Sequence, residues 1–354
     1  MKCLVTKLNG VVDNDSILRI GEMSIAFSKS TSPNKTSQGI NLLSSGDCDL
    51  RIIGDGHFTD ETLTQNLGKS KHIVAGSQED VYVSNGDFNL IISDKYSLRL
   101  VNIVPSNTSN PTKTDLACKT FDLAELKFSK KLAGLQFNDS KIVGDISNLK
   151  GLTEIQSISV AYTAIKGDIA SLAGMTRLTA ITITDTSIGG NISALGNCKE
   201  FTELFARGSA VFGNVSTFAN LPKISIIQMM NAKGDIASLA SCSVLKFFET
   251  TYGNVTGDLS KLPSSTKQAN FFNTSSVLSW GSERSSSAYI LAINGSPKIS
   301  NIDNMLINQA KCTVGSGQSI ESKKITATGT RTSASDAAVA TLQQKGYTVS
   351  ITPA

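Results

Sequence analysis

Side chains that could support acid–base chemistry or hold a metal ion are scarce in this chain. It contains only two histidines, His57 and His72, and neither a Gly-x-Ser-x-Gly nor a His-Glu-x-x-His motif accompanies them. His57 stands in the stretch Gly-Asp-Gly-His-Phe, between Asp55 and Asp60, where three side chains could share a metal ion. The same letters are typical of a turn that leads into a strand, and we favour that interpretation.

Carboxylates offer a second route to chemistry, because glycoside-cleaving enzymes use a pair of Asp or Glu side chains. Four acidic residues come near the strands predicted below, but not in a common register: Glu154, Asp185, Glu203 and Glu249. The outward strand positions predict instead a hydroxyl-rich surface that binds a partner or a glycan, or is simply soluble. It comprises Ser157, Ser159, Thr182, Thr184 and Thr250. We predict no catalytic residue, no cofactor-binding residue and no metal ligand.

None of the six cysteines belongs to a Cys-x-x-Cys pair or has a histidine beside it, so we expect neither a zinc site nor a disulfide framework. The six are Cys3, Cys48, Cys118, Cys198, Cys242 and Cys312. Cys198 and Cys242 fall at the same apolar position of the repeat described next. That placement predicts buried free thiols that pack as small hydrophobic side chains.

Glycine recurs in the central part of the chain at steps of 23, 23, 23, 21 and 23 residues. The glycines are Gly144, Gly167, Gly190, Gly213, Gly234 and Gly257. A similar phrase follows each of them, such as Gly-Asp-Ile-Ser-Asn-Leu from Gly144 and Gly-Asp-Ile-Ala-Ser-Leu from Gly167. A fixed period of this length is the signature of a solenoid, in which each unit buries its apolar side against its neighbours.

Within a unit the apolar residues step first by three and then by two. In the second unit Leu172, Met175 and Leu178 have the helical spacing, and Ile181 and Ile183 have the strand spacing. We therefore predict a leucine-rich-repeat-like solenoid, in which each unit is a short helix and a short strand. Its strands stack into a parallel sheet, and a turn through glycine restarts the cycle. Equivalent strand positions are Ile158, Val160, Leu204 and Phe248.

The Asp or Asn after each glycine has a local explanation, because its side chain can accept backbone N–H groups at a turn or helix start. We interpret the four aspartates as caps: Asp145, Asp168, Asp235 and Asp258. A ladder of aspartates can also bind calcium. Asn191 and Asn214 interrupt this one, and no Gly-Gly-x-Gly-x-Asp pattern is present, so no calcium is expected.

The fold class predicted for the whole chain is mixed and β-rich. Residues 1–105 carry period-two apolar runs separated by turns such as Asn9-Gly10 and Asn85-Gly86, which predicts a β-sandwich-like docking domain. Residues 106–120 have the composition of a linker, and residues 121–280 form the solenoid. Its first part, residues 121–143, is a capping repeat.

Residues 281–354 form a C-terminal capping region with a β-α-β pattern. A loop at residues 281–287 precedes a strand at 289–293, a helical face at 302–306 and a second strand at 325–328. Ser333 or Ser335 then caps a helix that Gly346 ends, and alternation from Tyr347 to Ile351 gives a final strand. We expect this region to close the open end of the solenoid.

Charge and hydropathy exclude several partners. The net charge of +4 comes from 33 basic and 29 acidic residues, and it is too weak and dispersed to predict nucleic-acid or membrane binding. Lys166, Lys199, Lys223 and Lys233 do not share a repeat position, so no basic stripe is expected. No run approaches the ~20 apolar residues of a membrane span. The N-terminus lacks the apolar stretch of about 7–15 residues of a signal peptide, so a protein found outside the cell would have to leave by another route.

Three features together resemble virion proteins of crAss-like bacteriophages of gut Bacteroides. They are the opening Met-Lys-Cys-Leu-Val-Thr-Lys-Leu-Asn-Gly running into Leu18–Glu22, the Gly-Asp-Ile repeats, and residues 338–348. Similar Gly-Asp-Ile ladders occur in leucine-rich proteins of the hosts. The resemblance implies a head fibre whose N-terminal domain docks on phage capsid proteins while the C-terminal part projects outward. No catalytic residue comes with it.

We therefore expect a non-enzymatic phage structural protein, a head fibre or capsid decoration on the outer surface of the head, assembled in the host cytoplasm. Its expected partners are capsid proteins, further copies of itself in a dimer or trimer, and a host-surface glycan or protein. One alternative is a bacterial surface leucine-rich-repeat adhesin, which the missing export signal disfavours. A polysaccharide-degrading solenoid enzyme is another, and a clustered carboxylate pair would support it.

Overall fold

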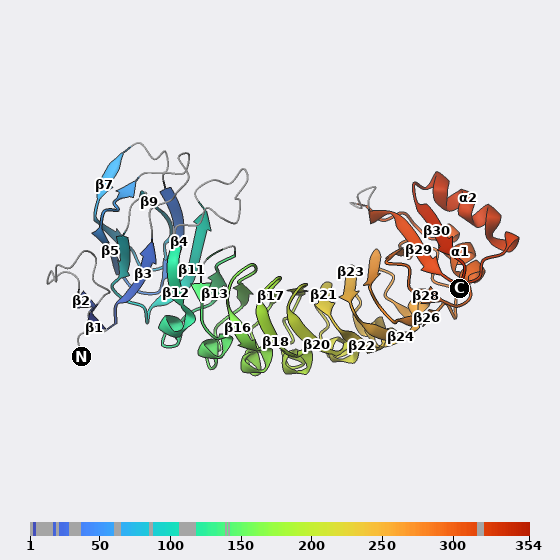
Figure 1. The fold of residues 1–354 in the computed structure, drawn as a ribbon, viewed down its shortest axis with the longest axis horizontal. Coiled ribbons are helices and arrows are strands. Elements are labelled where there is room, and N and C mark those ends of the chain that lie inside the picture. Colours follow the sequence, from blue (N-terminus) through green and yellow to red (C-terminus); the bar gives the residue numbers. More distant parts are fainter. Residues whose placement is uncertain are drawn as a thin grey trace. The chain divides into compact units, whose positions relative to one another are not determined.

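A computed structural model describes residues 3–4, 17–18, 21–27, 37–59, 65–84, 88–105, 118–138, 140, 142–316 and 322–354. Figure 1 shows the ribbon, coloured along the sequence. The chain divides into two compact units. The first unit consists of Met1–Leu178 and Thr182–Ile188, and the second of Thr179–Ile181 and Gly189–Ala354. Within the described residues, no helix is long and apolar enough to cross a bilayer.

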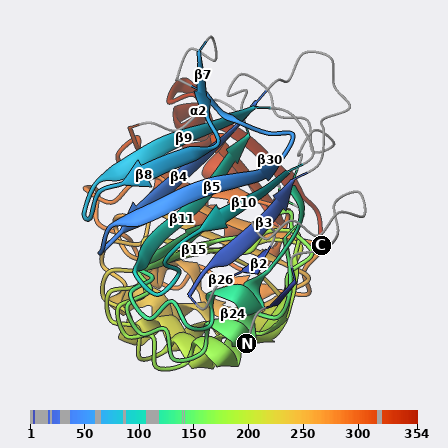
Figure 2. The same cartoon turned by 90° about the vertical axis from the view of Figure 1, so that its left-hand side faces the viewer.

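The N-terminal part of the first unit contains two antiparallel sheets, which Figure 2 shows in blue and teal. One sheet has the order β12-β3-β10-β5-β8, made of Cys118–Asp122, Met23–Phe27, Phe88–Ile92, Cys48–Gly54 and Ser70–Ile73. The other has the order β11-β4-β9-β6-β7, made of Leu98–Pro105, Ser37–Ser44, Gln78–Ser84, Phe58–Thr59 and Asn66–Gly68. A short pair, β1 (Cys3–Leu4) and β2 (Ile17–Leu18), is separate.

The apolar runs of the sequence form the cores of these strands, with Ile25, Leu50 and Leu90 fully buried. The period-two apolar runs predicted strands in this part of the chain, and strands are present at Cys48–Gly54, Phe88–Ile92 and Leu98–Pro105. The assignment to a sandwich stays a prediction. The expected turns at Asn9-Gly10 and Asn85-Gly86 lie outside the described residues.

Both N-terminal sheets continue into the repeats of the first unit. Strand β11 pairs in parallel with β13 (Gly134–Gln136), which pairs in parallel with β15 (Ser157–Ser159). Strand β12 pairs in parallel with β14 (Ile142–Val143). Residues 118–120, assigned to a linker, thus belong to a strand, while residues 106–117 lie outside the described part. Parallel pairing begins at the edges of the antiparallel sheets themselves.

Each repeat contains a short 3-10 helix and two short strands. In the first unit the helices are η2 (Leu123–Leu126), η3 (Ile146–Leu149) and η4 (Ile169–Leu172), and β16 (Lys166–Asp168) contains a repeat glycine. Strands β17 (Ala180–Thr182) and β18 (Ser187–Asn191) lie where the division between the units falls. The predicted helical turn and strand are both present, and η2 with β13 and β14 forms the predicted first repeat.

The second unit contains two parallel ladders of strands. The first ladder consists of β19 (Glu203–Ala206), β21 (Ile226–Met230), β23 (Phe247–Thr251), β25 (Gln268–Phe272) and β27 (Ala292–Asn294). Leu204, Ile227 and Phe248 stand in one register, which confirms the predicted stacking of strands. The fold is thus a leucine-rich-repeat-like solenoid.

The second ladder was not predicted, because the glycine segments were expected to be turns only. It consists of β20 (Ala210–Asn214), β22 (Ala232–Asp235), β24 (Asn254–Asp258), β26 (Val277–Ser279) and β28 (Lys298–Ile299). The 3-10 helices η6 (Val215–Asn220), η7 (Ile236–Ser241) and η8 (Leu259–Lys261) follow its glycines, and η5 (Ile192–Leu195) follows Gly190 of β18. Short strands around glycine give little sequence signal, since glycine is depleted in strands.

The repeat glycines are fixed by a contact with the previous repeat. Gly257 has a φ of +103°, and a Cβ atom there would lie 1.9 Å from Oδ1 of Asp235. In the first unit Gly167 has a φ of +113°, and its Cβ would lie 2.4 Å from Oδ1 of Asp145. Only glycine tolerates both this backbone conformation and this proximity.

The acidic and amide side chains after these glycines are caps, as predicted. Oδ1 of Asp145 accepts the backbone N–H of Ser147 at 2.8 Å, and Oδ1 of Asp235 accepts that of Ala237 at 2.8 Å. Asn191 and Asn214 cap η5 and η6 in the same way. Hydrogen bonds from the Ser147 side chain and backbone lower the pKa of Asp145.

The C-terminal part of the second unit has the predicted β-α-β order, with α1 (Ile302–Lys311), β29 (Lys324–Thr328), η10 (Ser333–Ser335), α2 (Asp336–Gln344) and β30 (Thr348–Thr352). Strand β29 pairs in parallel with β27 and with β30, so the first ladder extends beyond residue 280. Thr332 caps η10, whereas the hydroxyl of Ser335 at the start of α2 donates to Asp303. The predicted role of this region as a cap stays a prediction.

Candidate interaction surface on the strand face

The outward side of the first ladder in the second unit carries the densest group of interacting polar side chains. Successive residues of a strand point to opposite faces. Because Leu204, Ile227 and Phe248 are buried in the core, the next residue of each strand faces outward. These outward residues share one register across five strands: Phe205, Gln228, Glu249, Asn270 and Asn294.

Glu249 is the centre of this group. Its Oε1 accepts Nε of Arg207 at 2.9 Å, Nη2 of Arg207 at 2.6 Å and Nε2 of Gln228 at 2.9 Å. Its Oε2 accepts Nδ2 of Asn270 at 2.9 Å. Asn294 in turn donates to Oδ1 of Asn270 at 2.9 Å, so the bonded chain crosses four neighbouring strands from β21 to β27.

Burial of the Glu249 carboxylate is unusual for the outer face of a sheet. Its side chain is 2% exposed, whereas the side chain of Arg207, which follows β19, is 53% exposed. A buried carboxylate is costly unless charged and hydrogen-bonding partners satisfy both oxygens. Arg207, Gln228 and Asn270 satisfy both oxygens, which fixes the side chains of four neighbouring repeats relative to one another.

Apolar side chains flank this network. Ile226 and Phe247 occupy one neighbouring register position, and Met230 and Phe272 lie on the other side of the network in a second one. Like Phe205, they are only half-buried. We call the whole group the strand-face site, composed of Phe205, Arg207, Ile226, Gln228, Met230, Phe247, Glu249, Asn270, Phe272 and Asn294.

The strand-face site has the chemistry of binding. Cleavage of a glycoside would need a second carboxylate across the bond. Glu203 stands two residues away from the register of Glu249, in line with Ile226 and Phe247, as the sequence predicted when it placed the acids out of register. What the site does offer is an exposed guanidinium beside aromatic and aliphatic side chains.

The histidines lie elsewhere, in the first unit. His57 is half-buried and directly precedes β6, so the expected strand follows it. The choice of a turn over a metal site stays a prediction. Its suspected metal partner Asp60 lies outside the described residues. His72 Nδ1 lies 2.6 Å from Oδ1 of Asp49. Across the described ranges, no group of three or more His, Cys, Asp or Glu side chains is placed to hold a metal ion.

The other acids have structural roles. Glu154 pairs with Arg177 in the first unit, and Glu200 pairs with Lys223 in the second, each with a residue one repeat further on. Asp185 occupies a corner with a φ of +50°, a conformation that Asp tolerates better than most residues. The ion pair of Glu154 and the corner position of Asp185 thus account for the two remaining candidate acids.

Two details of the predicted surface were wrong. Thr250 is fully buried, because it lies two residues from the inward Phe248, and its hydroxyl accepts the backbone N–H of Ala232. Lys166 and Lys233 do share a repeat position, since each directly precedes a repeat glycine. The other predicted hydroxyl positions are half-buried: Ser157, Ser159, Thr182 and Thr184.

The cysteines Cys198 and Cys242 are buried free thiols, as predicted. Burial raises the pKa of both, and that of Cys242 rises to about 11. Cys48 and Cys312 are also free and buried. Nothing is described for the side chains of Cys3 and Cys118.

Sequence reasoning missed the strand-face site, although part of its signal was present. Once Leu204, Ile227 and Phe248 are taken as inward, the alternation places Phe205, Gln228 and Glu249 outward. The pairing of Arg207 with Glu249 spans 42 residues and two repeats, so it depends on a register that the sequence alone does not supply.

No family model matches the chain, and no curated protein matches it. Solved structures similar to it include a plant peptide hormone receptor, RGFR1, in complex with RGF2, at 20% identity and a TM-score of 0.42. That likeness covers 55% of this chain and 37% of the receptor chain. An internalin from Listeria monocytogenes shares 18% identity over 65% of this chain and 78% of its own, with a TM-score of 0.38.

A leucine-rich-repeat protein of Leptospira interrogans is also similar, at 11% identity and a TM-score of 0.40 over 51% of this chain and 44% of its own. At these low identities and TM-scores, the assignment to a leucine-rich-repeat-like solenoid rests on the parallel ladders and the capped 3-10 helices. The likeness to the plant peptide hormone receptor covers less than half of that receptor chain.

Proposed function

We propose that the protein is a non-catalytic recognition protein that binds a protein partner through the strand-face site. The observation that carries the proposal is Glu249, a carboxylate buried on the outer face of a sheet by Arg207, Gln228 and Asn270. A solenoid does not need this network to fold, because its core lies on the opposite side of the strands. The network instead holds the outer face in one fixed arrangement.

The composition of the site fits protein recognition. Binding energy in protein interfaces concentrates in aromatic residues and arginine, which bury large areas and make directed hydrogen bonds. Phe205, Phe247 and Phe272 belong to the same strand-face site as an arginine whose Nε and Nη2 are held by Glu249. The complementary partner presents apolar side chains and an oxygen acceptor, such as a carboxylate or a backbone carbonyl, to the exposed edge of Arg207.

Site-specific photo-crosslinking tests the proposal. A crosslinking residue at Phe247 is expected to capture a discrete partner, while the same residue at the exposed Val244, outside the strand-face site, captures none. Affinity for the captured partner is then measured with purified components. Phe247→Ala and Arg207→Ala are each expected to weaken it by about tenfold or more, whereas Val244→Ala leaves it unchanged. Equal capture at both positions, or unchanged affinity of both variants, would contradict the proposal.

We further propose the setting that the sequence resemblance implies, a head fibre or decoration on a phage particle. In it the N-terminal β domain docks on capsid proteins, and the chain assembles as a dimer or trimer in the host cytoplasm. Support comes from the resemblance and from the β-strand content of residues 21–105. The test is co-purification of the protein with phage particles, together with crosslinks from the N-terminal domain to a capsid protein. Absence from purified particles would overturn this setting and leave the recognition role standing.

A further inference from the structure

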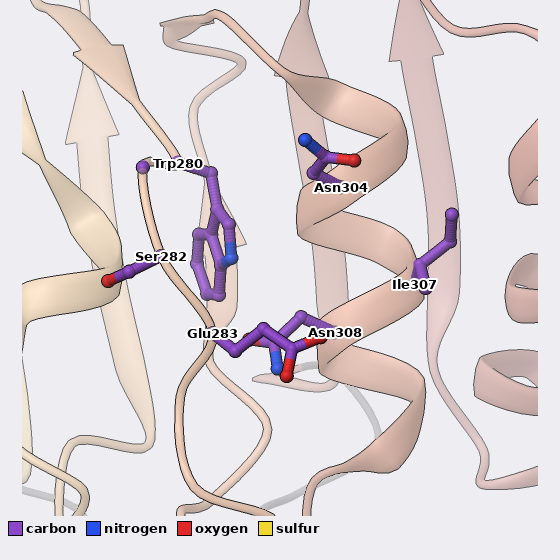
Figure 3. A pocket seen from close by; sticks show the side chains of 7 residues that line it. Trp280, Ser282, Glu283, Asn304, Ile307 and Asn308 are labelled. Atoms are coloured by element: carbon purple, nitrogen blue, oxygen red, sulfur yellow. The ribbon is translucent and has the colours of Figure 1, made fainter.

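A pocket of about 250 Å³ lies in the second unit between the chain after β26 and helix α1 (Figure 3). Its lining residues are Trp280, Gly281, Ser282, Glu283, Asn304, Ile307 and Asn308. None of them belongs to the strand-face site, so the pocket is a separate feature. It is smaller than the cavities of about 300–1,000 Å³ that hold drug-sized ligands.

Trp280 brings an unused hydrogen-bond donor to this pocket. Its side chain is buried, with only 2% of the residue exposed, and its indole N–H has no acceptor within the described chain. Figure 3 shows the indole nitrogen on the ring edge that is turned toward α1. A buried donor without an acceptor opposes folding, and the indole N–H of a buried tryptophan usually finds a partner. An oxygen atom entering beside it gains a donor that is already desolvated.

The other polar groups of the lining divide into used and available ones. Asn308 is used, because its Oδ1 accepts the backbone N–H of Arg284 at 2.9 Å and its Nδ2 donates to the Arg284 carbonyl. Asn304 is exposed, and its side chain makes no hydrogen bond to any described residue. The Glu283 carboxylate receives Nζ of Lys311 at 2.9 Å and is otherwise open to solvent.

This set of groups defines the chemistry of a ligand. It offers one fixed donor, an amide that donates and accepts, and a carboxylate that accepts, with Ile307 as an apolar wall. The charge of Glu283 is balanced by Lys311, so the pocket attracts neither an anion nor a cation strongly. A neutral molecule that carries both hydroxyl donors and oxygen acceptors on a small ring matches all of these groups.

We propose that this pocket binds a pyranose sugar. Trp280 donates to a ring or hydroxyl oxygen, Asn304 bonds to a hydroxyl group, and Glu283 accepts from a second hydroxyl. The proposal is independent of the strand-face site and of any protein partner bound there. Single sugar units bind weakly, so a Kd on the order of 1 mM is expected.

Trp280 makes the test specific because it is the only tryptophan of the chain. The fluorescence of the full chain, excited where tyrosine does not absorb, is titrated with the methyl pyranosides of glucose, galactose, mannose and N-acetylglucosamine. Acetate and phosphate serve as charged probes. At least one sugar is expected to give a saturable change, and the two anions none. Saturation by an anion, or no saturable change at about ten times the expected Kd, overturns the proposal.

Variants separate binding in the pocket from a distant effect. Asn304→Ala removes an exposed side chain and is expected to weaken sugar binding about tenfold, the effect of one lost hydrogen bond. Gln344→Ala removes an exposed amide from α2, outside the pocket, and should leave the Kd unchanged. Trp280→Phe keeps an aromatic ring without the N–H, and calorimetry is expected to show a similar loss. Equal affinity of the wild-type chain and both lining variants contradicts the proposal.

Discussion

The strand faces of the two units differ, although their repeats share one frame. By frame we mean the repeat glycines and the Asp or Asn caps that follow them. In the first unit the outward residues of β15 are Ser157 and Ser159, and the hydroxyl of Ser159 donates to Asn138. The same ladder position in the second unit carries Phe247 and Glu249, with a buried ionic network. The comparison therefore distinguishes two kinds of residue. Some build the repeat and are alike in both units, and the outward strand residues differ and are free to acquire a function.

The shared frame explains why such divergence is tolerated. Gly167 fits against Asp145 in the first unit as Gly257 fits against Asp235 in the second, and both aspartates cap the next 3-10 helix. These contacts lie at the opposite end of the repeat from the outward strand residues. A change on the strand face leaves them untouched, so the face can become polar or aromatic without loss of the solenoid.

The largest expected effect comes from breaking the frame that the two units share. Gly167→Ala and Gly257→Ala each place a methyl group against an aspartate in a left-handed backbone conformation. Each is expected to lower the free energy of unfolding by about 2–4 kcal/mol. Chemical denaturation measures the loss, and hydrogen exchange locates the loosened repeats even where folding is incomplete.

Gly174→Ala is the matched control for this frame. Gly174 also has a positive φ, of +91°, but its Cβ would meet no atom within 4 Å. Only the conformational cost of roughly 1–2 kcal/mol is then expected. Destabilisation by Gly174→Ala as large as that of the other two variants would show that the contact with aspartate is unimportant.

The second largest effect contrasts the two faces directly. Glu249→Ala removes the acceptor that Arg207, Gln228 and Asn270 share, and we expect it to lower the free energy of unfolding by ~1–3 kcal/mol. Ser159→Ala, on the first unit's face, is expected to stay within ~0.5 kcal/mol. Thermal and chemical unfolding of both variants measure the difference.

Glu249→Gln sharpens the same contrast. A glutamine has one oxygen and one amino group, so either Asn270 or the pair Arg207 and Gln228 faces a donor instead of an acceptor. We expect this variant to lie between the wild-type chain and Glu249→Ala in stability. A fully stable Glu249→Gln chain would mean that the charge has no part in ordering the face.

A third, smaller effect is a difference between the cores of the two units in how the free energy of unfolding depends on pH. The repeat position of Cys242 holds Met175 in the first unit, which does not titrate. Burial raises the pKa of Cys242 from 9.0 to about 11, so the unfolded chain ionises this thiol at a lower pH than the folded chain does. Stability from this thiol is therefore complete below pH 9.0 and is lost as the pH rises toward 11.

The measurement compares the unfolding free energy of the wild-type chain and Cys242→Ala as the pH is raised. The wild-type chain is expected to lose about 2 kcal/mol more over this window. Tyr347, whose pKa burial raises to about 12, contributes in the same direction in both proteins and cancels in the comparison. Parallel profiles would contradict the assignment to Cys242.

The smallest effect is expected for the exposed ion pairs that occur at equivalent positions in both units. Glu154 with Arg177, and Glu200 with Lys223, are exposed ion pairs between equivalent repeat positions. Double-mutant cycles with alanine should give a coupling of about 0.2–1 kcal/mol for each pair, decreasing with added salt. A coupling well above this range in only one unit would show that the frames are less alike than their geometry indicates.

Much of the frame could be predicted because it depends on the spacing of residues that are close in the sequence. The spacing of Leu172, Met175 and Ile181 gave a helical turn and a strand, and the residue after each glycine gave the cap. Buried free thiols at Cys198 and Cys242 followed from their apolar repeat position. These inferences need only neighbours within one repeat.

The rest depends on contacts between repeats or on strands with weak patterns. The second ladder consists of short strands interrupted by glycine, and β4 contains Ser37, Gln38 and Gly39 before its apolar residues. The pairing of Arg207 with Glu249 requires the register of three strands. The Trp280 pocket arises where α1 packs beside a loop, which no local spacing encodes.

The contact between each aspartate or asparagine and the glycine one repeat further on also bears on how such a chain can change length. A duplication or deletion of one whole turn joins a familiar cap to a familiar glycine, and the new junction resembles every older one. An insertion that moves a repeat glycine away from the preceding aspartate or asparagine places a side chain where only glycine fits. Growth by unequal recombination is therefore expected to proceed in whole turns, and the strand face gains or loses one row of side chains at each step.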